Sequence, residues 1–330
     1  MAMLKALTAV DVGQRLGITL IASAMGVACA SSADPMEPGH EYGTRPELVA
    51  PDSGWLPTVN PAKAVGWSEG AMPTPAEGLA VNAFATDLVH PRWLHVLPNG
   101  DVLVAETNSP ASEGGFSGIK GWVAEKMMHY AGAATPSPDR ITLLRDTDND
   151  GVADLQTVLV EELHSPFGMA LVDSHLYVAN ADALVRFPYT VGETRIDAEA
   201  ETVAPLPGGS LNHHWTKNLL AAPDGSALYV AVGSNSNIGE NGLDNEFQRA
   251  AILHIDPETG ATRVFASGLR NPVGMAWQPD SGALWTVVNE RDELGDQLVP
   301  DYLTEVEAGA FYGWPYSYWG QYVDTRVTPQ

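Results

Sequence analysis

The chain has 330 residues, of which 45% are apolar, so it is long enough to bury a sizeable core. It carries 41 acidic and 17 basic side chains, a formal charge of −24, together with 32 Gly and 24 Pro. This composition excludes a disordered or collagen-like chain. The negative charge repels phosphate backbones, which argues against nucleic acid as a partner and leaves cations and neutral ligands.

The first 33 residues have the pattern of an export signal. Two basic residues precede an apolar, small-residue run over residues 16–30, and a polar stretch follows. The run is shorter than the ~20 residues that a spanning helix needs. Cys29 leaves two alternatives open, lipidation in a lipoprotein-type signal or ordinary cleavage after Ala30. Both predict an exported protein, periplasmic or anchored to the membrane as a lipoprotein.

We expect residues 34–77 to form a leader and residues 78–330 to form a single domain. The leader is rich in Pro and Gly and has no clear periodicity. Cys29 is the single cysteine of the chain, which excludes an intramolecular disulfide and a multi-cysteine metal site. The domain must therefore be held together by its core alone.

Four hairpin patterns recur in this domain, each an apolar run, a Pro/Asp/Asn/Gly turn and a second apolar run. They occupy residues 93–104, 168–178, 218–230 and 274–285. Their turns lie about 50 to 75 residues apart, which fits one four-stranded propeller blade with an insertion. Stretches that fit the outer strands lie at 141–144, 158–160, 251–255 and 262–266. The sequence predicts an all-β propeller, with a β-sandwich as the alternative.

Two further segments complete the prediction. Helical apolar spacing over residues 119–130 predicts a short helix inserted after the first hairpin. Residues 303–322 begin another aromatic, glycine-bearing unit that stops before it is complete. Because propellers close with four to eight blades, we expect four to five blades here and a chain truncated at its C-terminal end.

An aspartate-rich loop has the spacing of a calcium site. Carboxylates stand at loop positions 1, 3, 5 and 9, with a glycine at position 6 for the sharp turn, and belong to Asp146, Asp148, Asp150 and Asp154. Thr157 stands where an EF-hand has its bidentate Glu, so the pattern favours a small structural Ca²⁺ loop. The alternative is a solvated turn between two strands.

The loop that enters the third hairpin carries two histidines. The stretch Asn-His-His-Trp-Thr-Lys-Asn places His213 and His214 shortly before Lys217. An imidazole takes up a proton near neutral pH, and the lysine offers its charge to an anionic group. One alternative is a structural histidine, and the other is a zinc site with His164 or His175 as its third ligand.

Polar residues also flank the fourth hairpin. Arg270 and Asn271 precede it, and Asn289 with the acidic cluster 290–296 follows it. The planar guanidinium of Arg270 suits a carboxylate, and the acidic cluster offers oxygen ligands to a hard cation. The alternative is a turn with a surface salt bridge.

Five motifs together resemble the PQQ-dependent glucose/sorbosone dehydrogenase family over about residues 80–325, most closely its sorbosone branch. They are Val104-Ala-Glu-Thr107, the stretch from Gly118 to the aspartate-rich loop, His214-Trp-Thr-Lys217, Gly268-Leu-Arg-Asn-Pro272, and residues 289–296 leading to Gly313-Trp-Pro315. The resemblance implies a six-bladed propeller that binds pyrroloquinoline quinone (PQQ) and Ca²⁺.

The resemblance also implies roles for residues. His214, with His213 as alternate, takes the hydroxyl proton of an aldose or sugar aldehyde while hydride passes to the quinone, and Arg270 acts beside it. Lys217 stands where the family has an arginine. Residues implied to contact the cofactor are Lys217, Asn218, Arg270, Asn271, Asn289, Glu290 and Arg291. Main-chain oxygens of Glu290 and Arg291, with Asp292 nearby, are implied to hold a Ca²⁺ that polarises the quinone.

Two other functions fit parts of the sequence. The first is a non-enzymatic propeller that binds a carbohydrate or a protein through exposed aromatic residues near Trp314–Trp319. The second is metal-dependent lactone hydrolysis on a calcium propeller. The sugar and the electron acceptor, a quinone or a cytochrome, are left open by the sequence.

Overall fold

The computed structural model describes residues 43, 46–52, 61–68, 70–110 and 118–328. The predicted export signal lies outside these residues. Contacts divide the chain into a first unit of residues 1–62 and 291–300 and a second unit of residues 63–290 and 301–330. The predicted boundary between leader and domain, at residues 77 and 78, differs from this division. No helix among the described residues is long and apolar enough to cross a membrane.

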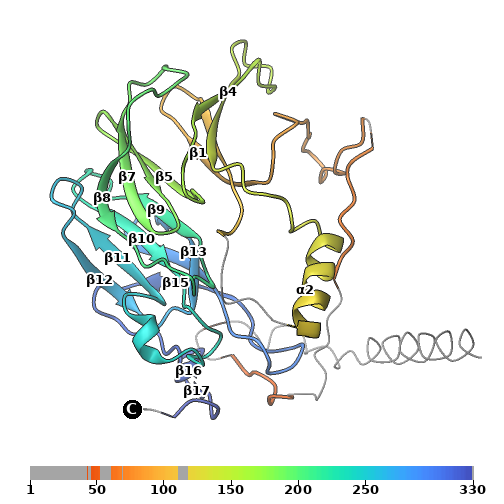
Figure 1. Cartoon of the computed structure of the whole chain (residues 1–330), viewed down its shortest axis with the longest axis vertical. Helices are drawn as coiled ribbons and strands as arrows, with labels where there is room; N and C mark the ends of the chain where they lie inside the picture. The colour runs from red at the N-terminus through yellow and green to blue at the C-terminus, as the bar shows by residue number, and fades with distance from the viewer. Residues whose placement is uncertain (1–42, 44–45, 53–60, 69, 111–117, 329–330) are drawn as a thin grey trace, which may run out of the picture. The chain divides into compact units, whose positions relative to one another are not determined.

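The second unit consists of antiparallel sheets (Figure 1). The first sheet contains β1 (Pro91–Val96), β2 (Val102–Glu106), β3 (Arg140–Arg145) and β4 (Leu155–Val160). The second contains β5 (Gly168–Val172), β6 (His175–Ala179), β7 (Ala183–Pro188) and β8 (Glu201–Pro205). The third contains β9 (Lys217–Ala221), β10 (Leu228–Val232), β11 (Ala251–Ile255) and β12 (Thr262–Ser267).

The fourth sheet contains β13 (Asn271–Trp277), β14 (Leu284–Asn289) and β15 (Tyr302–Val306). A small pair follows, formed by β16 (Ser317–Tyr318) and β17 (Tyr322–Val323). Helix α2 (Gly118–Tyr130) lies between β2 and β3, where the sequence predicts a helical insertion.

The four large sheets are the blades of a β-propeller. In each sheet the strands follow one another in chain order or its reverse, and the first strands of neighbouring blades touch, β1 with β5, β5 with β9 and β9 with β13. Figure 1 shows the blades succeeding one another from the yellow β1 to the blue β13. The predicted propeller and its four inner hairpins are confirmed, and the β-sandwich is not formed.

The second strand of a blade supplies core residues to both of its faces, because side chains alternate along a strand. On β6, Leu176 packs with the first blade, whereas Tyr177 packs with the third. On β10, Val230 packs with the second blade and Ala231 with the fourth. Burial of one large apolar side chain contributes about 1.5–3 kcal/mol, so the contacts between blades stabilise the propeller.

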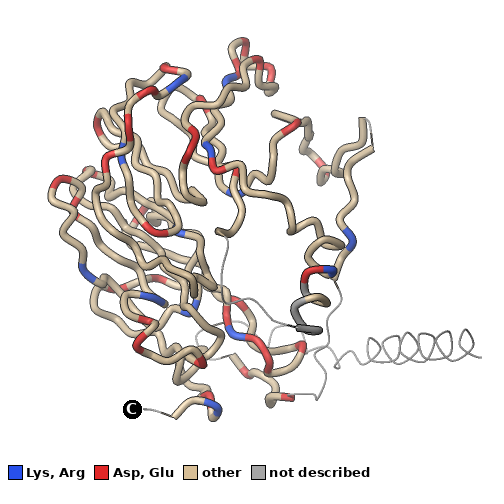
Figure 2. The backbone as a smooth tube through the Cα atoms, viewed as in Figure 1, with Lys and Arg blue, Asp and Glu red and all other residues tan. Residues whose placement is uncertain are grey.

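Buried carboxylates of the first blade are paired, although acidic residues are spread along the loops of the chain (red in Figure 2). Asp101 receives two hydrogen bonds of 2.7 Å from Arg145, which lower the pKa of that carboxyl. Glu106 receives bonds of 3.0 and 3.1 Å from Arg140. Pairing is the condition under which a carboxylate can be buried in this acidic chain.

Residues 303–322 differ from the prediction. β15 pairs with β14, with Leu284 opposite Val306, so the beginning of this stretch adds a third strand to the fourth blade rather than opening a further blade. Trp314 and Tyr318 are each 3% exposed, and the Trp314 indole donates to the Asn237 carbonyl at 2.9 Å. The exposed aromatic surface expected of a binding propeller is therefore wrong for these two residues.

Gly168 begins β5 where that strand runs against β9. A Cβ at Gly168 would lie 2.3 Å from the Leu219 amide nitrogen and 2.6 Å from the Lys217 carbonyl oxygen. We expect Gly168→Ala to lower the free energy of unfolding, measured in urea, by about 1–3 kcal/mol, because backbone atoms must move apart. Gly66→Ala is the control, since a Cβ there would meet nothing within 4 Å. An equal effect in both variants would contradict the tight packing of β5 on β9.

Candidate functional site

The polar loops of the third and fourth blades meet at one face of the second unit. The register of the inner hairpins explains why, since the first strand of each hairpin begins opposite the end of its second strand. The facing residues are Gly168 and Ala179, Lys217 and Val232, and Asn271 and Asn289. The loop that enters a blade and the loop that leaves its first hairpin thus lie at the same end. There the Ser234 amide donates to the Arg270 carbonyl oxygen at 2.7 Å and joins the two blades.

His214, in the loop that enters β9, is oriented by the loop that leaves β10. Its Nδ1 lies 2.8 Å from the Ser234 carbonyl oxygen and 3.1 Å from the Ser234 hydroxyl. A carbonyl oxygen accepts only, so Nδ1 carries the proton of the neutral ring and Nε2 is the basic nitrogen. Burial, with the charge of Arg270 next in importance, lowers the pKa of His214 to about 3. The ring is therefore neutral at physiological pH.

His213 is exposed, unlike its neighbour. Its amide donates to Asn235 Oδ1 at 3.2 Å, and its ring lies edge-on to the His214 ring with centroids 4.6 Å apart. The structure therefore orients His214 through a ring nitrogen and holds His213 through its backbone.

The zinc alternative for this histidine pair is wrong within the described residues. His164 lies 2.9 Å from Asp182, and His175 begins β6 at the opposite end of its hairpin. In the part of the chain that the structure describes, three potential ligand atoms of His, Cys, Asp or Glu come within 4.8 Å of one another only at Asp146, Asp148 and Asp154.

Lys217 is completely buried and braces the loop that carries His214. Its Nζ donates to the Trp215 carbonyl at 2.9 Å and lies 3.4 Å from Asn212 Oδ1 and 3.5 Å from the His214 carbonyl. Burial, followed by the charge of Arg249, lowers the pKa of Lys217 well below its ordinary value. The predicted contact of Lys217 with an anionic cofactor stays a prediction, and the contacts described here are positioning contacts.

Asn218 and Asn271 each bring a buried polar atom to this region. Asn218 Nδ2 and Asn271 Oδ1 have no hydrogen-bond partner among the described residues, whereas Asn218 Oδ1 accepts from the Met275 amide at 3.1 Å. A Cβ at Gly233 would lie 2.3 Å from Asn271 Oδ1 and 2.5 Å from the His214 Cβ. The missing side chain of Gly233 thus allows the Asn271 amide and His214 to lie against the same stretch of backbone.

The buried Arg270 guanidinium joins the loop after β10 to the loop after β14. Its Nε and Nη2 donate to the carbonyl and the side-chain oxygen of Asn237 at 3.2 and 2.9 Å. Its Nη1 donates to the Glu290 carbonyl at 2.5 Å and to Asn289 Oδ1 at 3.2 Å. The Glu290 carbonyl is the oxygen predicted to bind Ca²⁺, and a carbonyl has a second lone pair. Asn237 was not predicted as a site residue.

Arg291 and Asp292 belong to the first unit, whereas Glu290 belongs to the second. Arg291 is buried and Asp292 is exposed. The predicted roles of Arg291 and Asp292 in binding the cofactor and Ca²⁺ stay predictions.

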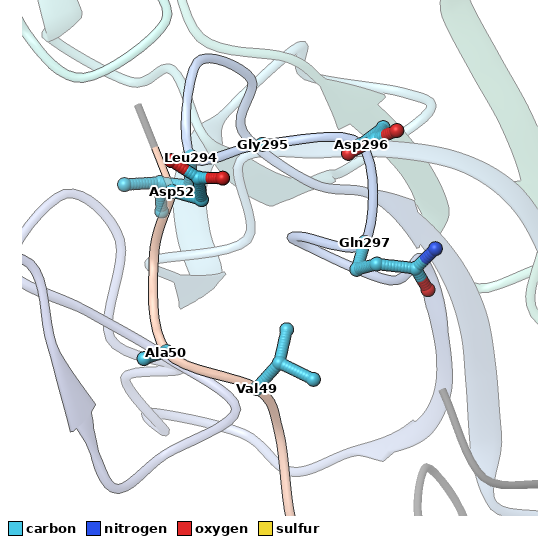
Figure 3. A pocket seen from close by; sticks show the side chains of 7 residues that line it. All are labelled: Val49, Ala50, Asp52, Leu294, Gly295, Asp296 and Gln297. Carbon is cyan, nitrogen blue, oxygen red and sulfur yellow. The ribbon is translucent and has the colours of Figure 1, made fainter. Parts of the chain in front are cut away.

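The first unit has a pocket of its own, between residues 49–52 and 294–297 (Figure 3). The Asp52 amide donates to the Leu294 carbonyl at 3.0 Å, which joins the two segments. Figure 3 shows the Asp296 and Gln297 side chains on the second of these segments. No sequence signal predicted this pocket.

Three of the four predicted calcium ligands come together in the aspartate-rich loop. Carboxylate oxygens of Asp146, Asp148 and Asp154 lie within 4.8 Å of one another. Asp150 lies outside this group, and its Oδ1 accepts from the Val152 amide at 2.8 Å. The loop therefore offers a hard cation a cluster of three carboxylates rather than four.

Arg249 is also buried in this region, and unlike Arg270 it was not predicted from the sequence. Its Nη2 donates to Asn212 Oδ1 at 3.0 Å and to the Gly208 carbonyl at 3.1 Å, and its Nη1 lies 3.4 Å from the Gly233 carbonyl. Arg249 precedes β11, an outer strand, where no motif marks a functional position. It holds the loop that enters β9 against the loop that leaves β10.

The fold and this face define a class, a β-propeller that presents an oriented neutral histidine beside a buried arginine. Residues 139–308 match the TrAA12-like family, and the chain belongs to that family. The crystal structure of a carbohydrate-active enzyme of family AA12 from Trichoderma reesei has the same fold, with a TM-score of 0.58 at 19% identity over 76% of this chain and 62% of that chain.

Two curated relatives match shorter stretches. The aldose sugar dehydrogenase YliI of Escherichia coli K12 is 41% identical over 135 residues, which cover 35% of this chain and 32% of the relative. An uncharacterized protein of Borreliella burgdorferi is 25% identical over 167 residues, which cover 48% of this chain and 43% of the relative. The chain thus spans less than half of the length of either relative.

The lowered pKa of His214 makes stability depend on pH. Between the ordinary pKa of 6.5 and about 3, the unfolded chain binds a proton at His214 that the folded protein does not bind. Stability from this residue is therefore complete above the ordinary pKa and is lost as the pH falls through this window. The charged and titratable groups that lower its pKa are Arg270, His213 and Lys217.

We expect the free energy of unfolding of the wild-type protein to fall more steeply than that of His214→Gln between about pH 6.5 and about pH 4, because glutamine takes up no proton. Urea denaturation at a series of pH values measures both slopes. Parallel slopes would show that the His214 pKa is not lowered by folding.

Proposed function

We propose that the chain is a quinoprotein dehydrogenase that oxidises an aldose or a sugar aldehyde, of the glucose or sorbosone kind, by hydride transfer to PQQ with Ca²⁺. Its membership of the TrAA12-like family and its 41% identity to an aldose sugar dehydrogenase over 135 residues support the proposal. The observation that carries it is the orientation of His214, whose Nδ1 lies against the Ser234 carbonyl at 2.8 Å. That contact leaves Nε2 as the base.

At Nε2, His214 takes the proton of the hydroxyl on the carbon that is oxidised, which in a sugar aldehyde is a hydroxyl of the hydrated form. The ring then becomes an imidazolium, and its Nδ1–H bond to the Ser234 carbonyl strengthens because the donor is now charged. The lowered pKa of His214 favours release of the proton to solvent once the substrate is oxidised. PQQ, when bound with Ca²⁺, supplies the acceptor for the hydride that leaves the carbon bearing this hydroxyl.

The residues around His214 fit such a cofactor. Asn271 Oδ1 and Asn218 Nδ2 are buried polar atoms without a partner among the described residues, and both residues belong to the predicted cofactor contacts. The Glu290 carbonyl, which accepts a hydrogen bond from Arg270, is a neutral oxygen of the kind that Ca²⁺ binds. The resemblance implies further cofactor contacts from Lys217, Arg270, Asn289 and Arg291, with Asp292 near the Ca²⁺.

We also propose that the protein is exported by its first 33 residues, with Cys29 lipidated or the signal cleaved after Ala30. The electron acceptor of such an enzyme would be a quinone or a cytochrome. The pattern of the N-terminal sequence supports export, and the chemistry of a two-electron cofactor requires such an acceptor.

Titration with PQQ in the presence of Ca²⁺, followed by dye reduction with a panel of aldoses and sugar aldehydes, tests the proposed function. We expect binding and dye reduction in the wild-type protein. We expect His214→Ala to lower kcat by about 10²-fold or more while PQQ still binds, because the general base is lost. His164→Ala is the control, since this exposed histidine lies outside the oriented pair.

Other outcomes of this experiment point to other functions. The absence of both PQQ binding and dye reduction would contradict the dehydrogenase and favour a non-enzymatic binding propeller. Turnover of a lactone without added quinone would instead favour metal-dependent hydrolysis. Equal activity of His214→Ala and wild type would remove His214 from the catalytic centre.

Ca²⁺ should stabilise the folded protein through the aspartate-rich loop. An ion that binds only the folded state raises the free energy of unfolding by about 2.7 kcal/mol at 100 times its Kd. We expect Ca²⁺ to raise Tm in the wild type and in Asp150→Asn, and to raise it less in Asp148→Asn, whose carboxylate belongs to the group of three. Equal shifts in Asp148→Asn and wild type, measured by scanning calorimetry, would place the ion elsewhere.

A further inference from the structure

A carboxylate outside the predicted site anchors the loop that orients His214. Glu246 ends the short helix η1 (Leu243–Glu246), which follows β10 along the chain. Its Oε2 accepts from the Asn235 amide at 2.7 Å, and its Oε1 accepts from the Ser236 hydroxyl at 2.5 Å. The Asn235 amide and the Ser236 hydroxyl thus both donate to a single half-buried side chain.

From these two residues a continuous series of hydrogen bonds leads to the imidazole. The Ser234 hydroxyl donates to the Ser236 carbonyl at 2.6 Å. The Ser234 carbonyl and hydroxyl oxygens lie 2.8 and 3.1 Å from His214 Nδ1. Glu246 therefore reaches the ring through two serines and does not touch it.

The loop needs such an anchor because its backbone has little regular structure. Residues 233–242 contain three glycines, of which Gly239 and Gly242 have φ values of +90° and +91°. Because glycine has no Cβ, a loop that contains several glycines can adopt many backbone conformations. Without the Glu246 carboxylate, the Asn235 amide and the Ser236 hydroxyl would lose their acceptor, and a buried donor without an acceptor is unfavourable. The segment would then reorient to find other acceptors.

We propose that Glu246 is a positioning residue that fixes the Ser234 carbonyl and thereby the tautomer and orientation of His214. The effect on the ring follows from the hydrogen bonds alone. The effect on catalysis rests on the proposed function, because it needs His214 to act as the base. Glu246 also lies near the charges of Arg249 and Glu240, neither of which bonds to the Asn235 amide or the Ser236 hydroxyl in the described contacts.

The tautomer of His214 is the direct readout. In protein labelled with ¹⁵N-histidine, the Nδ1 and Nε2 shifts distinguish the two neutral tautomers, and the spectrum of His214→Gln assigns the signal. We expect the wild type to show a single neutral form with the proton on Nδ1. We expect Glu246→Ala to show a mixture of both forms, because the carbonyl that selects Nδ1–H then keeps only the contact of the Ser234 amide with Arg270 and loses the support of Ser236.

Kinetics give a second readout. In Glu246→Ala we expect kcat for sugar oxidation to fall about tenfold with little change in KM, because the base is misoriented while the other contacts of the site remain. Glu246→Gln should recover part of the loss, since its amide oxygen can still accept from the Ser236 hydroxyl. A fall in activity with a wild-type tautomer spectrum would overturn the proposal.

Asp244→Ala is the matched control, because it removes an exposed carboxylate from the same short helix. We expect its His214 spectrum to equal that of the wild type, and a tautomer mixture in this variant would show that the helix, not the Glu246 carboxylate, is responsible. If Glu246→Ala does not fold, Ser236→Ala tests the same link by removing the hydroxyl alone. A wild-type His214 spectrum in Ser236→Ala would overturn the proposal.

The two proposals fail separately. A wild-type protein that reduces no dye but shows a single His214 tautomer, lost in Glu246→Ala, would refute the dehydrogenase and leave the positioning role intact. A protein that oxidises sugars with an unchanged tautomer in Glu246→Ala would do the reverse.

Discussion

Ser234 makes contacts in three directions, and the candidate site depends on all of them. Its amide donates to the Arg270 carbonyl at 2.7 Å, which ties the third blade to the fourth. Its carbonyl and hydroxyl face His214 Nδ1, and its hydroxyl donates to Ser236. The histidine and the arginine lie far apart in sequence, so this one residue fixes their common frame. The packing of one blade on the next makes that frame rigid, because the strands that precede these loops are buried on both faces.

Much of the fold could be predicted because the inner hairpins repeat one local pattern. Their turns and their alternating apolar residues are properties of short stretches, so β1, β2, β5, β6, β9, β10, β13 and β14 were all expected. β7 and β8 were not, and β8 is a largely exposed edge strand whose residues do not alternate in burial. β15 was taken for the start of a new unit, because only its pairing with β14 shows to which blade it belongs.

Site residues that belong to a local sequence motif could be predicted, whereas residues whose position depends on burial and tertiary contacts could not. His214 stands three residues before β9 and Arg270 directly before β13, and the hairpin register was enough to bring them to one face. The complete burial of Lys217 depends on Asn212 and on carbonyls of its own loop, which no spacing reveals. Asp150 fits the calcium pattern by position, yet its carboxylate turns to the Val152 amide. Glu246 and Arg249 act through tertiary contacts that have no local signature.

Two permanently charged guanidinium groups, those of Arg249 and Arg270, are 6% and 1% exposed beside the His214 loops of a chain whose formal charge is −24. Screening by salt acts over about 10 Å at 0.1 M and hardly reaches charges buried in this way. The long-range field of the protein therefore repels an anion, whereas these two guanidinium charges, which Glu246 offsets in part, attract it at short range. As a result, the association and dissociation rate constants of an anionic ligand depend differently on salt. Added salt would speed the approach of an anionic ligand by weakening the outer repulsion, and it would leave the departure of that ligand nearly unchanged.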